Sequence, residues 1–176
     1  MTPPIADPST FSEQLASALD AGDIAAVLLR LADADERTLI NRVKTLAPSI
    51  QSKGAALLLD GRADLVARGG ADGAHLGDIA DFTAALATLK PERIVGAGGL
   101  ASRHNAMLAA EQGADYVMFG EPDPIGKCPA FAAVEERIAW WAEVFEAPCV
   151  GYSDSLETIA PLVAAGADFI ALGNAV

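Results

Sequence analysis

Two charged side chains end apolar runs that are typical of buried strands. Arg30 ends the run AVLLR, and Asp60 ends the run ALLLD. In parallel α/β barrels, sites are built from residues at the carboxyl ends of the strands. We interpret Arg30 there as an anion-binding group, with a surface arginine as the alternative. Asp60 is interpreted as a ligand of Mg²⁺ or of a polar group, with an N-cap of the following helix as the alternative.

Further polar residues lie where the chain leaves other predicted strands. Asp78 and Asp81 surround the start of a predicted helix, so they are either metal ligands or simple helix caps. Lys127 lies in a loop rich in Gly and Pro, of the kind that covers a barrel mouth, and it is either a phosphate-binding lysine or a flexible surface one. His75 is interpreted as a buried, hydrogen-bonded structural histidine.

An internal repeat indicates the elements that position these residues. Gly70-Ala71-Asp72, Gly113-Ala114-Asp115 and Gly166-Ala167-Asp168 each follow an Ala-rich amphipathic stretch and lead into a short apolar run. This pattern is typical of a helix that ends at a Gly in its C′ position, followed by a tight turn and a strand.

The rest of the chain fills in a regular alternation of helices and strands. Such alternation predicts a parallel sheet with right-handed crossovers, either as an open doubly wound sheet or as a closed barrel. No complete Gly-rich dinucleotide turn follows a strand, which favours the barrel. The predicted helices are 10–21, 36–52, 62–68, 81–89, 103–112, 131–145 and 156–164; the predicted strands are 24–30, 55–60, 73–76, 93–96, 116–120, 149–151 and 169–173.

The expected architecture is therefore a single domain, residues 1–176, with the α/β fold of a (β/α)₈ TIM-type barrel. Residues 1–9 are rich in Pro and are interpreted as a loop, so that the chain opens on a helix. The first strand and the last helix of the barrel are expected to be missing, with a seven-strand variant of the fold as the alternative.

Composition narrows the classes of partner. The net charge of −12 argues against nucleic acid and anionic membranes, because both reward surplus Lys and Arg. A small phosphorylated metabolite remains compatible with that charge. Cys128 and Cys149 form no CxxC motif, and no apolar run approaches the roughly 20 residues of a membrane span, so we expect a reduced, cytoplasmic protein. Trp140-Trp141 predicts either helix packing or a homo-oligomer contact.

Three phrases carry a resemblance to a known family. The stretch from Arg62 through GADGAHLG at 70–77, together with GADYVMFG at 113–120 and the segment 166–176, resembles the thiamine-phosphate synthase family. That family joins a pyrimidine diphosphate to a thiazole phosphate and releases diphosphate. The resemblance implies that Mg²⁺ and cationic side chains hold the leaving diphosphate, and that groups near the strand ends hold the phosphate of the thiazole.

The resemblance also assigns roles to particular positions. Arg30 matches the family's second-strand arginine, and Lys127 its loop lysine, so both would hold diphosphate. The family's metal carboxylates fall next to Asp60 and between Asp78 and Asp81. The acceptor phosphate would lie near a final set of residues: Gly151, Ser153 and Asn174.

Several matching positions depart from the family pattern. The Asn-Asp metal pair falls on Asp60-Gly61, the Ser-x-His of the fifth strand falls on Gly98-Gly99-Leu100, and the Gly-Gly after the seventh strand falls on Tyr152-Ser153. We therefore expect a slow synthase or an inactive one. Two alternatives stay open: a catalytically eroded barrel that binds a phosphorylated or heteroaromatic ligand, and another phosphate-ligand barrel enzyme such as an aldolase or isomerase.

Overall fold

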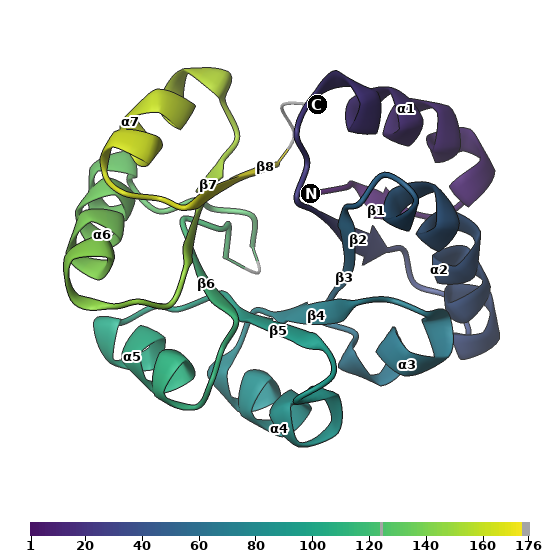
Figure 1. The fold of residues 1–176 in the computed structure, drawn as a ribbon, viewed down its shortest axis with the longest axis horizontal. Helices are drawn as coiled ribbons and strands as arrows, with labels where there is room; N and C mark the ends of the chain where they lie inside the picture. The colour runs from purple at the N-terminus through teal and green to yellow at the C-terminus, as the bar shows by residue number, and fades with distance from the viewer. Residues whose placement is uncertain (124, 174–176) are drawn as a thin grey trace.

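The structure is a computed structural model that describes residues 1–123 and 125–173. In this part of the chain, eight parallel strands pair in the order β1-β2-β3-β4-β5-β6-β7-β8, and helices surround them on the outside (Figure 1). The strands are β1 (Pro4–Ile5), β2 (Ala26–Leu31), β3 (Ala56–Asp60), β4 (Gly73–Leu76), β5 (Ile94–Ala97), β6 (Tyr116–Phe119), β7 (Cys149–Ser153) and β8 (Phe169–Leu172).

The helices cover the outer face of the curled sheet and follow the predicted ranges closely. They are α1 (Pro8–Ala21), α2 (Glu36–Gln51), α3 (Val66–Gly69), α4 (Ile79–Leu89), α5 (Arg103–Glu111), α6 (Phe131–Val144) and α7 (Ile159–Ala164). Short 3₁₀ turns at Ala63–Leu65 and Leu156–Thr158 lead into α3 and α7. None of the helices in the described ranges is long and apolar enough to cross a membrane.

The sheet curls into a barrel that stays open between β8 and β1 (Figure 1). Each strand is hydrogen-bonded to the next in sequence, and the order begins at β1 and ends at β8. A hydrogen bond of 2.6 Å from Met1 N to the carbonyl oxygen of Leu172 spans the gap between them. The α/β barrel architecture predicted from the sequence is thus confirmed.

The prediction that the first strand is missing is wrong. Pro4–Ile5 forms β1 and pairs with Arg30–Leu31 of β2. Hydrogen bonds from Thr2 N to Leu28 O and from Ala32 N to Ile5 O, both 3.0 Å, extend this pairing. Proline lacks the N–H that a central strand needs, but it is tolerated at the first position of an edge strand. A two-residue strand that depends on its partner leaves no pattern in its own sequence.

The repeated Gly-Ala-Asp phrase has a structural role in all three copies. Gly70, Gly113 and Gly166 adopt positive φ angles of 78°, 96° and 105° at the ends of helices, as predicted. The aspartate of each copy then ties its turn to the preceding strand. Its carboxylate accepts a hydrogen bond from a backbone N–H: Asp72 from Leu57 at 2.7 Å, Asp115 from Val95 at 2.7 Å, and Asp168 from Cys149 at 2.8 Å.

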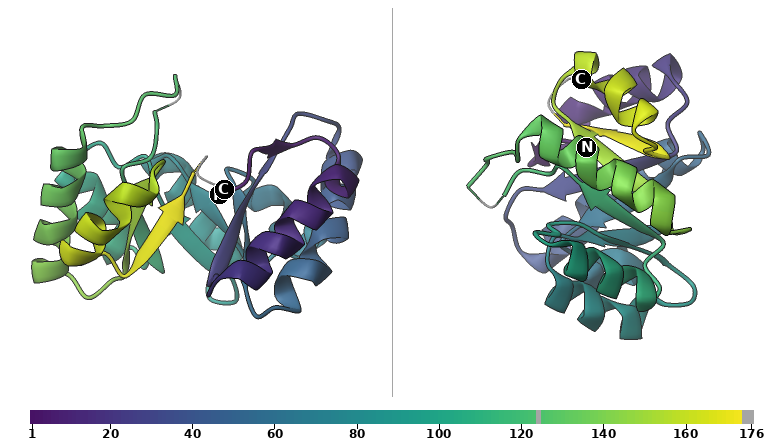
Figure 2. Two further views of the ribbon diagram at one scale, coloured as in Figure 1. Left: turned by 90° about the horizontal axis from the view of Figure 1, so that it is seen from above. Right: turned by 90° about the vertical axis from the view of Figure 1, so that its left-hand side faces the viewer.

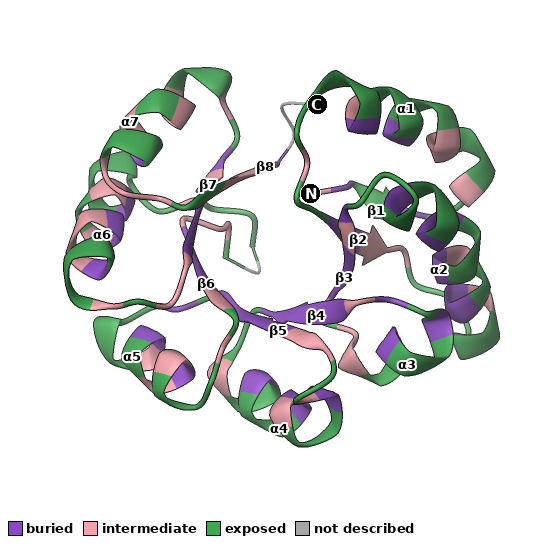
Figure 3. Cartoon of the chain, in the orientation of Figure 1, coloured by how far each residue is buried: buried purple, intermediate pink, exposed green. Residues whose placement is uncertain are grey.

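Two apolar clusters lie on opposite faces of the sheet. The larger one joins the outward-facing strand residues to the helices, as the buried helix faces in Figure 3 show. The smaller one lies inside the barrel and consists of Leu28, Leu58, Met118 and Val150, with Tyr116 and Tyr152 among the partly buried residues packed against it. The inner cluster forms the floor beneath the barrel mouth.

Candidate active site at the barrel mouth

One layer of paired positions crosses five neighbouring strands and carries a polar side chain on four of them. Leu29 of β2 is level with Leu59 of β3, so Arg30 and Asp60 follow at the same height. Asp60 pairs with His75 of β4, and His75 pairs with Gly96 of β5. Gly96 in turn pairs with Tyr116 of β6.

The side chains of this layer point into the barrel. Leu28 and Leu58 belong to the inner cluster, whereas Leu29 and Leu59 belong to the outer one. Because side chains alternate along a strand, Arg30 and Asp60 face the same side as Leu28 and Leu58. The layer therefore lies directly above the apolar floor, at the carboxyl ends of the strands.

His75 is at the centre of a closed hydrogen-bond network on the β4–β6 side. It is buried, with 1% of its surface exposed. Its Nδ1 lies 2.9 Å from the hydroxyl of Tyr116, and its Nε2 lies 2.8 Å from Oε1 of Glu121, the second residue after β6. The other carboxylate oxygen of Glu121 accepts a hydrogen bond of 3.0 Å from Gly99 N. The expectation that His75 is buried and hydrogen-bonded is confirmed.

Two glycines make the space for this network. A Cβ atom on Gly96 would lie 2.0 Å from the ring of Tyr116. A Cβ atom on Gly98 would lie 2.0 Å from Oε2 of Glu121 and 2.3 Å from Nε2 of His75. Real Cβ atoms do not approach other atoms so closely, so the end of β5 has no room for side chains at either position.

The network favours a charged pair of His75 and Glu121. Burial lowers the pKa of His75, but the charge and hydrogen bond of Glu121 and the charge of Asp60 raise that pKa above its usual value. Burial raises the pKa of Glu121, but His75 and the N–H of Gly99 bring that pKa below its usual value. Burial, with the charges of Glu121 and Asp60, raises the pKa of the Tyr116 phenol, which therefore stays neutral.

Arg30 and Asp60 are different because they keep unused hydrogen-bonding atoms. Arg30 Nε donates to the carbonyl oxygen of Thr2 at 2.8 Å, and its two terminal nitrogens have no hydrogen-bond partner among the described residues. The Asp60 carboxylate likewise accepts no hydrogen bond from a described residue. Burial raises the pKa of Asp60, Glu121 raises it further, and His75 and Arg30 oppose the shift.

The other predicted metal ligands lie on the neighbouring strand end. Asp78 follows β4 and is the N-cap of α4, because one of its oxygens accepts from Ala80 N at 2.7 Å and from Asp81 N at 3.4 Å. Asp81 is exposed in the first turn of the same helix. No group of three or more candidate metal ligands occurs in residues 1–123 and 125–173.

Lys127 lies in the loop between β6 and α6, which projects beyond the end of the sheet (Figure 2). Its side chain is exposed, and the Asp123 carboxylate holds the loop by accepting from Ile125 N at 3.0 Å and from Lys127 N at 2.9 Å. The loop leaves the same edge of the sheet as the polar layer, so Lys127 stands above the mouth rather than in it.

Two of the residues predicted for the acceptor phosphate, Gly151 and Ser153, do not direct a side chain into the interior. Gly151 faces the helices, since a Cβ there would lie 3.1 Å from Ile138 Cδ1. Ser153 is buried, and its hydroxyl is committed to the turn after β7, where it donates to Ser155 O at 2.5 Å and also contacts the Thr158 hydroxyl. Asn174 lies outside the described residues. Their roles in phosphate binding stay predictions.

The sequence interpretation did not assign a role to Tyr116 of the polar layer or to Glu121, which is hydrogen-bonded to His75 of that layer. Tyr116 was hidden in a strand, where an aromatic residue is usually core. Glu121 belongs to the acidic run 121–123, which is typical of a solvated loop. The signal that could have identified Glu121 is its position, because it directly follows the Gly that ends an apolar run.

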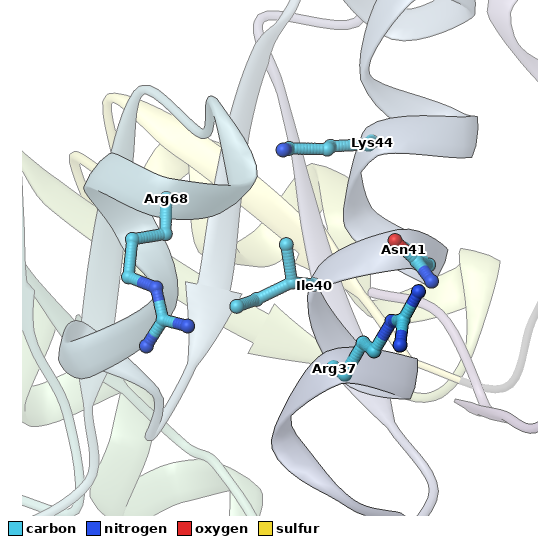
Figure 4. A pocket seen from close by; sticks show the side chains of 5 residues that line it. All are labelled: Arg37, Ile40, Asn41, Lys44 and Arg68. Carbon is cyan, nitrogen blue, oxygen red and sulfur yellow. The ribbon is translucent and has the colours of Figure 1, made fainter.

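A separate cationic groove lies in the helical layer outside the barrel. It has a volume of about 460 Å³ and is lined by Arg37, Ile40, Asn41, Lys44 and Arg68 of α2 and α3 (Figure 4). Arg68 forms an ion pair with Glu36. None of the polar-layer residues lines this groove, so it is not part of the candidate site.

Fold and site together define the class: an α/β barrel whose charged, hydrogen-bonding groups gather at the carboxyl ends of parallel strands, as in barrel enzymes. The sequence profile of the family described as "Thiamine monophosphate synthase" matches residues 1–176. The chain belongs to this family.

Individual relatives agree with the family assignment. The chain is 45% identical to a protein of Rhodospirillum centenum named thiamine-phosphate synthase, over 98% of this chain and 84% of the relative. It is 38% identical to one of the same name from Hyphomonas neptunium, over 100% of this chain and 83% of the relative. A solved structure, thiamine phosphate pyrophosphorylase from Pyrococcus furiosus, superposes with a TM-score of 0.76 at 26% identity, covering 92% of this chain and 78% of that one.

Proposed function

We propose that this protein condenses hydroxymethylpyrimidine diphosphate with thiazole phosphate to give thiamine phosphate and diphosphate. The observation that carries the proposal is the pair Arg30 and Asp60, level on adjacent strands of a barrel of this family, with hydrogen-bonding atoms left open at the mouth. The substrates are small phosphorylated metabolites, and we expect the protein to act on them in the cytoplasm.

Arg30 would bind the diphosphate that leaves the pyrimidine. Its Nε is held by Thr2 O, so the guanidinium is oriented before a ligand arrives. The two terminal nitrogens can then donate in parallel to phosphate oxygens. Negative charge builds on the diphosphate as its bond to the pyrimidine breaks, and a preorganised cation stabilises that charge. Lys127 would add a second cation from the loop above.

Mg²⁺ fits this site only as an ion that the substrate helps to hold. Asp60 and Asp78 stand at adjacent strand ends, and Mg²⁺ is commonly bound by one or two carboxylates together with substrate phosphates. We propose these two as ligands, with Asp81 as the more exposed third candidate. When bound, the ion would neutralise charge on the diphosphate. Arg30 and His75 keep Asp60 available by opposing the rise in its pKa.

The acceptor's phosphate would lie on the β7–β8 side of the mouth. We keep Gly151, Ser153 and Asn174 as the proposed residues there. A side chain at Gly151 would point toward the helices, and the Ser153 hydroxyl is hydrogen-bonded within the turn after β7. These two residues therefore offer only backbone groups to an anion.

Product analysis tests the function directly. The protein is incubated with both substrates and Mg²⁺, and thiamine phosphate and diphosphate are quantified. We expect the two products in equal amounts. Parallel reactions omit one substrate or replace Mg²⁺ with a chelator, and calorimetric titrations measure each substrate with and without Mg²⁺. Product that needs both substrates and Mg²⁺ supports the proposal. Tight binding of both substrates without any product would refute it.

A further inference from the structure

The carboxylate of Glu121 lies in a pocket of hydrogen-bond donors at the end of β5. Its Oε1 is 2.8 Å from His75 Nε2, and its Oε2 is 3.0 Å from Gly99 N. Only 12% of the Glu121 side chain is exposed. A carboxylate at such a position, between an imidazole and a backbone N–H, is held as an anion in an anion-binding concavity.

The concavity depends on two consecutive glycines. A Cβ on Gly98 would lie 2.0 Å from Oε2 of Glu121, so the carboxylate fills the volume that a side chain would take. Gly99 has a φ of +60°, and a Cβ there would lie 1.8 Å from the carbonyl oxygen of Gly77. The backbone can therefore bring the Gly99 N–H to Glu121 only because both positions lack side chains.

An ordinary ligand for such donors is a phosphate or another oxyanion. Here the occupant belongs to the chain itself, because Glu121 reaches back from the loop after β6. We propose that Glu121 is a specificity-determining residue: its carboxylate fills this anion site and confines the phosphate groups of a ligand to the Arg30 side of the mouth. The proposal rests on the proposed function for the statement that the ligand carries phosphate groups.

The proposal predicts a gain of binding when the carboxylate is removed. Glu121→Ala leaves the His75 and Gly99 donors in place, vacates the volume and removes one negative charge. An inorganic phosphate can then take the position. The charge of Asp60 also acts on an anion there, but it is the same in every variant compared, so it does not affect the difference.

The experiment uses calorimetric titration with inorganic phosphate and with diphosphate. Arg30→Ala serves as the background, so that binding by Arg30 cannot mask the new site. Against this background we expect Glu121→Ala to tighten phosphate binding by about tenfold or more, since charge-assisted hydrogen bonds contribute on that scale. The matched control, Glu121→Gln, keeps the volume filled and should bring no such gain.

Three results would overturn the proposal: equal affinities with and without Glu121, an equal gain from Glu121→Gln, or a gain that persists in full when His75→Phe removes the imidazole donor. If Glu121→Ala is unfolded in buffer, its refolding by phosphate, followed by circular dichroism, supports the proposal, and failure to refold counts against it. These outcomes are independent of product formation by the unaltered protein, so a failed synthase assay and a failed anion site are told apart.

Discussion

The two sides of the polar layer use their hydrogen bonds in opposite ways. On β4–β6, His75 is hydrogen-bonded to both Tyr116 and Glu121, and Glu121 also accepts from Gly99 N. On β2–β3, Arg30 keeps its terminal nitrogens and Asp60 its carboxylate open to the mouth. On the β4–β6 side the polar side chains are hydrogen-bonded within the protein, whereas on the β2–β3 side donor and acceptor groups remain available to a ligand. We therefore expect the charged part of a ligand to bind on the β2–β3 side.

Arg30→Ala should have the largest effect on activity. Removing one preorganised electrostatic contact commonly costs about 10²–10³ in rate, so we expect a loss of that size in kcat/KM, with loss of diphosphate binding. Because Arg30 also holds Thr2, a small drop in the thermal midpoint is expected as well. Arg30→Lys, which keeps the charge but not the paired donors, should recover part of the binding. A variant that unfolds several degrees lower and still binds diphosphate would make Arg30 structural.

Gly98→Ala should lower the free energy of unfolding by disturbing the hydrogen-bond network on the β4–β6 side. The new methyl group meets both Glu121 and His75, and overpacking of this kind costs roughly 1–3 kcal/mol. Denaturant unfolding measures the effect, with Gly77→Ala as the control because a Cβ there meets nothing within 4 Å. Adding Glu121→Ala should relieve part of the cost. If the effects of the two changes are simply additive, the cost of Gly98→Ala does not come from contact with Glu121.

The charged pair should give stability a pH dependence that Glu121→Gln lacks. The contribution of His75 is fully present below its unfolded pKa of 6.5, and is lost as pH rises through its higher folded pKa. The contribution of Glu121 is present above its unfolded pKa of 4.5, and is lost as pH falls through its lower folded pKa. The stability of the unaltered protein should therefore exceed that of the Glu121→Gln variant most at pH values between these two unfolded pKa values. The excess should shrink above neutral pH by roughly 1.4 kcal/mol for each pH unit that separates the two pKa values of His75. A constant difference from pH 4 to 9 would contradict the charged pair.

Lys127→Ala should have the smallest effect. The side chain is exposed on a loop above the mouth, where salt screens its charge. We expect diphosphate affinity to fall by only about 2–5-fold at low salt, with less difference at high salt. Lys53→Ala, which removes an exposed lysine in the turn that follows α2, serves as the control. A loss as large as that of Arg30→Ala would move the phosphate site into the loop.

Much of the fold could be predicted because its signals are local. The Gly-Ala-Asp turns mark helix ends through positive φ angles, and the predicted strand 73–76 has the observed bounds. β1 could not be predicted, because the two residues Pro4 and Ile5 are too few to show a periodicity. Their extended conformation depends on pairing with β2.

The candidate site was only partly predictable for a physical reason. Arg30 and Asp60 end their strands, so their position alone indicated the mouth. The network of His75, Tyr116 and Glu121 depends on strand register and on space left by glycines on a third strand. The sequence showed Gly98-Gly99 as a departure from the family pattern, but not that a carboxylate occupies the vacated volume.

Single-turnover formation of thiamine phosphate tests the central claim most directly. Enzyme in excess is mixed with hydroxymethylpyrimidine diphosphate, thiazole phosphate and Mg²⁺, and the product is followed by rapid quench. We predict that product forms in one turnover, more slowly than the ~1–10 s⁻¹ of an ordinary enzyme, because the proposed metal ligands are offset from the positions in the family pattern and Tyr152-Ser153 replaces its glycine pair after β7. Absence of product with both substrates bound would contradict the claim that this barrel is a synthase. Turnover at the ordinary rate would contradict the claim that the displaced groups limit it.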